Sequence, residues 1–238
     1  MQPRDTHQNR MKWLLIVTAW ATFALSSKIL ASILTEYVNY FPPDFNAEFL
    51  LGRRSYFFGS YALAFYAHII ISPVALILGA WLMWTGRRHG KKVWHRRLGK
   101  IQGVLIIAIV VPTGLVMSTR PMNGPVAGLG FASLSIALLI SILVAIAAAK
   151  KRDFAQHEIW ATRCFILLCS PLLLRLINGA ALVTQTQSPL SYQLSAWLSW
   201  IVPLAIFESV RGFGSRTQSG PAGESNPDLL RAKQVSSR

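Results

Sequence analysis

The sequence predicts an all-α membrane protein: a bundle of six transmembrane helices with both termini in the cytoplasm. Two features lead to this prediction, namely recurring apolar runs and clusters of basic residues between alternate runs. Hydrophobic residues make up 53% of the chain and charged residues only 14%, whereas a soluble protein has about a quarter charged. Each apolar run has roughly the 20 residues needed to cross about 30 Å of hydrocarbon.

Six runs reach this length, and they leave no room for a second folded domain. The predicted spans are residues 13–35, 61–84, 99–118, 126–149, 160–183 and 192–211. Residues 1–12 would form a cytoplasmic N-terminus. Residues 212–238 are rich in Gly, Ser, Pro and charge, which is typical of a disordered cytoplasmic tail.

The basic residues set the predicted orientation. TGRRHGKKVWHRRLGK joins the second and third spans and AKKRDFAQHE joins the fourth and fifth, whereas TQTQSPLS on the opposite side has no Lys or Arg. Lys and Arg accumulate in short cytoplasmic loops of membrane proteins. An even number of spans with both termini inside fits every connection. The net charge of +15 is therefore attributed to membrane topology and not to nucleic-acid binding.

The first span admits a second interpretation. MKWLLIVTAWATFALSS, from Met11, resembles a signal peptide, with a charged start, an apolar stretch and small residues after it. The apolar pattern resumes after Lys28 with ILASIL, which favours a retained span whose lysine reaches toward the interface. Cleavage would leave the other five spans oriented as before.

Three basic side chains lie deep within predicted spans. Counting 1.5 Å per residue from the outer end of each span places Lys28, His68 and Arg175 roughly 10–12 Å below the outer boundary. Ionisable groups in this region are costly and usually face a bundle interior or a water-filled cavity. Ser72 shares a helix face with His68, and Asn178 shares one with Arg175. We therefore expect these residues to form an intramembrane polar site.

Prolines accompany two of these residues. Pro73 lies five residues after His68, and Pro171 lies four before Arg175. Each proline leaves the carbonyl four residues earlier without its usual backbone partner. Two interpretations remain open. The polar groups bond one another and hold the second and fifth spans together, or they form a cationic site for an anionic ligand.

A second polar set lies at the cytoplasmic boundary. His95 opens the third span and His157 opens the fifth, so two imidazoles lie at matching depth on helices that could adjoin. His95, Gln102 and Thr113 line one face of the third span. Histidines that face each other across a bundle can hold haem iron axially. Packing at headgroup level is an alternative, and so is a non-haem metal, although no carboxylate with ligand spacing accompanies the pair.

The order of these motifs also carries a family resemblance. FYAHI, WHRRLGK, GLGFASLS, RDFAQHEIWATRCF and LLLRL follow one another between residues 60 and 185. This series resembles the domain of unknown function 2306 family, uncharacterised multi-pass membrane proteins that are mainly bacterial. Ala161 departs from the family pattern, which has a methionine after the tryptophan. The resemblance implies that the histidines and arginines of these motifs form one constellation, in a bacterial inner membrane.

The preferred hypothesis is a cytochrome-b-like membrane redox protein with one b-type haem. His95 and His157 would be the axial ligands of its iron. Arg96 and Arg163 would pair with the haem propionates. One haem is the most that the sequence accommodates, because the fourth span contains no histidine.

The outer polar site has a role in two hypotheses. In the redox hypothesis, His68 and Arg175 line a pocket for a quinone or a small anionic reductant. In the first alternative, a non-redox transporter or binding protein uses Lys28, His68 and Arg175 as a cationic site for an anionic solute or lipid. The second alternative is a membrane scaffold or assembly factor that acts through a homo-oligomer or a membrane partner.

Overall fold

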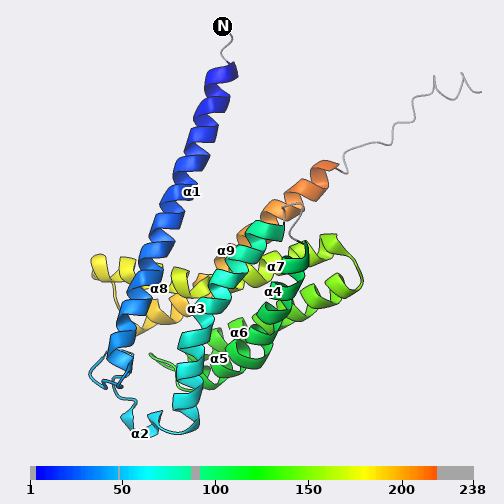
Figure 1. The fold of residues 1–238 in the computed structure, drawn as a ribbon. Helices are drawn as coiled ribbons and strands as arrows, with labels where there is room; N and C mark the ends of the chain where they lie inside the picture. Colours follow the sequence, from blue (N-terminus) through cyan, green and yellow to red (C-terminus); the bar gives the residue numbers. More distant parts are fainter. Residues whose placement is uncertain (1–3, 48, 87–91, 219–238) are drawn as a thin grey trace, which may run out of the picture. The chain divides into compact units, whose positions relative to one another are not determined.

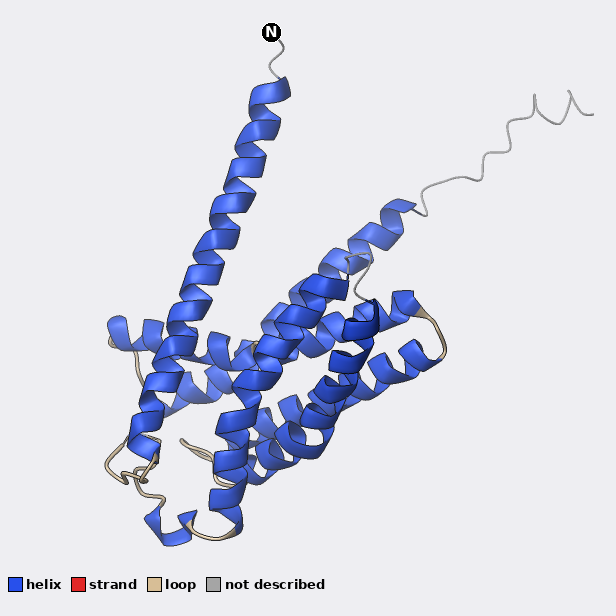
Figure 2. Cartoon of the chain, in the orientation of Figure 1, coloured by secondary structure: helices blue, strands red, loops and turns tan. Residues whose placement is uncertain are grey.

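The computed structural model describes residues 4–47, 49–86 and 92–218. These ranges fold into helices joined by short connections and contain no strand (Figure 2). Six of their segments are long and apolar enough to cross a membrane, which confirms the predicted fold class. They are Ile16–Tyr40, Ser60–Gly86, Val93–Ser118, Pro125–Lys150, Phe154–Val183 and Pro189–Gly212. The third and fifth begin at residues 93 and 154 instead of 99 and 160, so His95 and His157 lie inside them.

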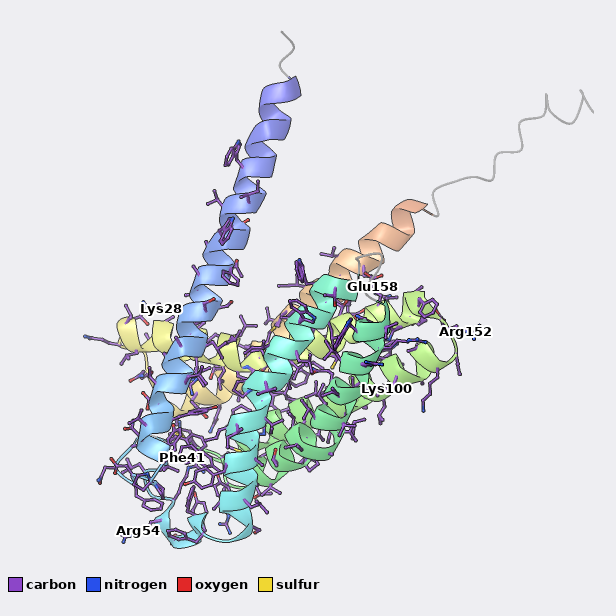
Figure 3. All side chains as sticks on the ribbon, in the orientation of Figure 1. Lys28, Phe41, Arg54, Lys100, Arg152 and Glu158 are labelled. Atoms are coloured by element: carbon purple, nitrogen blue, oxygen red, sulfur yellow. The ribbon has the colours of Figure 1, made fainter. Side chains whose placement is uncertain are left out.

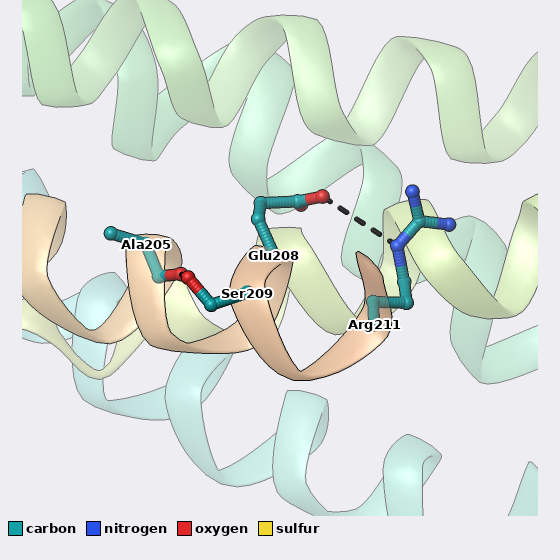
Figure 4. Close-up of polar contacts among 4 residues, drawn as sticks. All are labelled: Ala205, Glu208, Ser209 and Arg211. Carbon is teal, nitrogen blue, oxygen red and sulfur yellow. Dashed lines mark hydrogen bonds and ion pairs between the residues drawn. The ribbon is translucent and has the colours of Figure 1, made fainter. Parts of the chain in front are cut away.

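The chain divides into two compact units, Met1–Ile201 and Val202–Arg238. The boundary falls within the last helix, α9 (Pro189–Gln218). In the second unit, Glu208 and Arg211 form an ion pair with an N–O distance of 3.5 Å, and the Ser209 hydroxyl donates to the Ala205 carbonyl (Figure 4). Most of the tail predicted after residue 211 lies outside the described residues, from 219 onward.

Figure 1 shows the helices of the first unit in chain order. The first half contains α1 (Arg4–Thr35), a 3-10 turn (Glu36–Tyr40), the short α2 (Arg54–Phe57) and α3 (Ser60–Gly86). The second half contains α4 (Lys92–Leu105), a π turn (Ile106–Val110), α5 (Val111–Ser118), α6 (Pro125–Lys150), α7 (Phe154–Leu168) and α8 (Ser170–Val183). Helix α3 packs against α4, α5 and α7, and α6 packs against α5 and α7. Helix α1 packs against α8.

Prolines interrupt the third and fifth spans. Pro171 separates α7 from α8, because it can neither donate to the ladder nor fit its ring into an unbroken helix. The π turn directly precedes Pro112, and there the Val111 N–H bonds the Ile106 carbonyl five residues back. A π turn widens the backbone locally, which accommodates the proline ring.

Helix α3 continues through its own proline with help from another segment. Pro73 lies inside α3 and leaves the Ile69 carbonyl without its usual donor. The Tyr37 hydroxyl, in the 3-10 turn, donates to this carbonyl. The Tyr37 side chain thereby replaces the missing backbone bond. Lipid could not replace it, because hydrocarbon has no hydrogen-bond donor.

The connection between α1 and α3 folds into an aromatic cap. Its buried core consists of Tyr40, Leu50, Phe57, Tyr61 and Phe65. Arg53 is only 4% exposed and donates to the Phe49 carbonyl at 2.6 Å. It also donates to the Tyr61 hydroxyl at 2.8 Å and to the Arg120 carbonyl at 2.6 Å. One buried guanidinium thus ties the cap to the connection that follows α5.

The bond from Tyr37 to α3 can be tested with a double-mutant cycle. We expect Tyr37→Phe to lower the free energy of unfolding by about 1–2 kcal/mol, because it leaves the Ile69 carbonyl unpaired. Pro73→Ala restores a backbone donor to that carbonyl, so the same tyrosine change should cost much less in the Pro73→Ala background. Thermal unfolding in mild detergent measures both costs. Equal costs in the two backgrounds would contradict the assignment.

Candidate functional site

His95 on α4 and His157 on α7 face each other in the first unit. Their ring centroids are 6.4 Å apart, and their ring planes are nearly perpendicular, at 87°. The Nδ1 of His157 lies 2.9 Å from the Ala145 carbonyl of α6. A carbonyl can only accept, so Nδ1 donates its proton there. The neutral ring then keeps its lone pair on Nε2, where it can bind a metal.

Two glycines shape the surroundings of His95. The nearer one is Gly86, at the end of α3, where a Cβ would lie 3.2 Å from His95 Cε1. One turn along α4, a Cβ on Gly99 would meet nothing within 4 Å, so open space borders this face. The Nδ1 of His95 is buried and has no hydrogen-bond partner among the described residues. The His95 imidazole therefore has one nitrogen without a hydrogen-bond partner in the described residues, and there is open space on its side of α4.

Two arginines accompany the pair on the same helices. Arg96 directly follows His95 on α4 and is exposed. Arg163 lies on α7, with its guanidinium carbon 4.1 Å from the centroid of the Trp160 ring. A guanidinium over the face of an aromatic ring is held by a cation–π interaction. One of the two cations is thus held against an aromatic ring.

The pair alone supplies too few ligands for a protein-bound metal ion. In the part of the chain that the structure describes, no group of three or more His, Cys, Asp or Glu side chains could hold one. A haem iron is different, because it needs only its two axial ligands from the protein. Two metal–nitrogen bonds of about 2 Å would place the ring centroids about 6 Å apart. The observed separation of 6.4 Å is compatible with this arrangement.

His68 lies on α3 against α5. Its Nδ1 is 3.0 Å from the Thr113 hydroxyl, which in turn donates to the Ile109 carbonyl at 2.6 Å. The hydroxyl has one proton, so it accepts from His68. Gly114 leaves room for the ring, since a Cβ there would lie 3.4 Å from His68 Cε1 and 2.8 Å from Ser135 Oγ. The hydrogen-bond partner of His68 is therefore on α5 and not on the helix of Arg175.

Lys28 and Arg175 line one pocket between α1 and α8. The pocket holds about 440 Å³. Its other lining residues are Leu25, Ile29, Ser32, Leu176, Gly179, Ala180, Val183 and Thr184. Figure 3 labels Lys28 on α1. The structure thus brings together two members of the predicted polar site, whereas Asn178 is half-buried elsewhere on α8 and Ser72 lies on α3.

Gln102 is a polar residue that a search for ionisable groups overlooks. It is 5% exposed, and its Nε2 donates to the Ala75 carbonyl of α3 at 2.9 Å. Gly79, one turn along α3, leaves room for the amide, because a Cβ there would lie 3.4 Å from Nε2. His95, Gln102 and Thr113 all contact α3, which confirms the prediction that they share one face of the third span.

Comparison with known families gives a match over most of this region. The family described as a predicted membrane protein, DUF2306, matches residues 65–210. Neither a search of curated proteins nor a search of solved structures found a match. The matched range contains His68, His95, His157 and Arg175 but not Lys28. With its six apolar helices, the chain is a multi-pass integral membrane protein in contact with the lipid bilayer.

The bond between His68 and Thr113 predicts a specific cost. Thr113→Val should lower the free energy of unfolding by about 1–3 kcal/mol, because it removes the partner of a buried imidazole N–H. Thr113→Ser keeps the hydroxyl and should recover most of this loss. Thr119→Val is a matched control, since its exposed hydroxyl bonds only the Val116 carbonyl. Equal shifts in the thermal unfolding temperature at positions 113 and 119 would contradict the bond.

Proposed function

We propose that this protein is a membrane redox protein with one b-type haem between α4 and α7. The chain belongs to the DUF2306 family of predicted membrane proteins, since the family model covers more than half of it. The observation that carries the proposal is the meeting of His95 and His157 at 6.4 Å. Haem would supply one-electron transfer at this point. The open space beside Gly99 is compatible with a flat ligand on α4.

The protein's own groups prepare the two ligands. The bond from His157 Nδ1 to the Ala145 carbonyl fixes the ring and its tautomer, so that Nε2 carries the lone pair that a metal would bind. Arg96 and Arg163 are the cations that we assign to the two propionates, with which arginine forms charge-assisted hydrogen bonds. The cation–π contact of Arg163 restricts its side chain in advance of binding.

The basic connections support one orientation of the protein in the membrane. His95 and His157 each adjoin a connection rich in Lys and Arg, which favours a cytoplasmic position for the pair by the positive-inside rule. In this proposal both termini are cytoplasmic and the membrane is the inner membrane of a bacterium. We assign the quinone or small anionic reductant of this scheme to the pocket of Lys28 and Arg175, because His68 is engaged by Thr113.

A reduced-minus-oxidised visible spectrum tests the haem proposal. Full-length protein purified in mild detergent from haem-supplied cells should show the sharp band pair of a b-type haem. His95→Ala and His157→Ala should each abolish it, because each removes an axial ligand. His68→Ala is the matched control and should keep the bands. Bands that persist in both ligand variants, or a featureless spectrum of folded wild-type protein, would overturn the proposal.

The pocket between α1 and α8 favours a second candidate function. Two cations in an otherwise mostly apolar pocket suit an anionic solute or lipid headgroup, so the protein could be a non-redox transporter or binding protein. An anionic ligand that binds the folded state raises the unfolding temperature. We expect phosphatidylglycerol to stabilise the wild type more than phosphatidylcholine does, and Arg175→Ala to remove the difference. A difference that survives this substitution would exclude the pocket as the binding site. The same unfolding measurement with free phosphate separates the two sources of the anion, because a soluble anion would stabilise the protein without a lipid.

A further inference from the structure

Buried polar atoms without a partner gather along one face of α3. In the described ranges, three of them belong to α3 and α4: Ser72 Oγ, Gln102 Oε1 and His95 Nδ1. Ser72 lies on α3 between His68, which bonds Thr113, and Ala75, which accepts from Gln102, so it shares their face by helical periodicity. A buried polar atom left unpaired costs roughly 1–3 kcal/mol. Three on one face indicate a polar occupant between the helices.

We name this line of residues the polar seam: His68, Ser72, Gln102 and His95. Along α3 it extends from His68 to Gly86, which touches His95, a rise of about 27 Å at 1.5 Å per residue. It therefore connects the cytoplasmic histidine pair with a histidine in the outer half of the membrane. Its length is close to the roughly 30 Å thickness of the hydrocarbon.

The longest interval in the seam is lined by glycine. Gln102 and His95 are seven residues apart on α4, roughly 10 Å. Gly86 faces this interval from α3 at His95, and Gly99 lies within it on α4. At Gly79 the Gln102 amide and the Phe165 and Leu168 side chains of α7 already fill the space. Since a Cβ on Gly99 would meet nothing within 4 Å, the backbone leaves room there for small molecules.

We propose that a file of water molecules fills the polar seam and conducts protons along α3, between the end of the helix at Gly86 and the level of His68. A buried water needs two to four polar partners, and the unpaired atoms of Ser72, Gln102 and His95 are such partners at successive heights. Protons pass along the file by transfer between neighbouring waters, so that each proton entering at one end releases one at the other. The file goes beyond the redox proposal, and it does not require haem.

Thiol labelling tests the water directly. Cys164 and Cys169, the only native cysteines, are first replaced by alanine, and Ser72→Cys is then introduced into the full-length chain. Aminoethyl methanethiosulfonate reacts with the thiolate, which forms only where water reaches the sulfur. Val74→Cys is the matched control, because Val74 lies two residues further along α3 and is 48% exposed on the lipid side. We expect at least about tenfold faster labelling at position 72 than at position 74.

A second variant probes continuity of the file. Gln102→Leu removes its central polar group and should slow labelling at position 72. Labelling at position 72 that is no faster than at position 74, in monodisperse protein, would overturn the file. Proton entry into liposomes under a potassium diffusion potential, followed with an enclosed pH dye, needs no cysteine variant. Equal rates for the wild type and Gln102→Leu would overturn the proton role, whereas slower entry for the variant supports it.

Discussion

Helix α3 carries polar groups toward its neighbours, and other segments of the chain bond three of them. Hydrocarbon offers no partners, so an unpaired carbonyl or imidazole must find one within the protein. Tyr37 donates to the Ile69 carbonyl that Pro73 leaves without a backbone donor, and Thr113 accepts from His68. The Gln102 amide in turn finds its acceptor in the Ala75 carbonyl. The aromatic cap, the third span and α3 are therefore held in one register by hydrogen bonds that cannot be exchanged for lipid contacts.

The pair of His95 and His157 depends on hydrogen bonds of the same kind. Gln102 fixes α4 against α3 two turns from His95, and the Ala145 carbonyl fixes the ring of His157 on the other side. The distance between the two imidazoles is set by these anchors and by the close approach of Gly86. A ligand site built in this way is preorganised, because the supporting bonds exist before any cofactor binds.

The sequence predicts those features that depend on length, hydropathy and helical period. All six spans follow from apolar runs, and the shared face of His95, Gln102 and Thr113 follows from their spacing. Partners from distant segments could not be predicted in this way. Counting residues gives the depth of Lys28, His68 and Arg175 but not the neighbouring helix that each one faces. The structure groups Lys28 with Arg175 and His68 with Thr113.

Local irregularities were equally beyond sequence reasoning. The π turn before Pro112 depends on how the third span packs between α3 and α6. The burial of Arg53 depends on the fold of the connection between α1 and α3, whose sequence has neither a helical nor a strand periodicity. In both cases tertiary contacts decide among backbone conformations that the local sequence leaves equally open.

The most direct test of the histidine pair as a haem site is the low-temperature EPR spectrum of the oxidised full-length protein. If His95 and His157 together hold one haem iron, we predict a low-spin ferric signal that His95→Ala and His157→Ala each abolish. A high-spin signal in the wild type, a low-spin signal that survives in both variants or the lack of any haem signal would contradict this prediction.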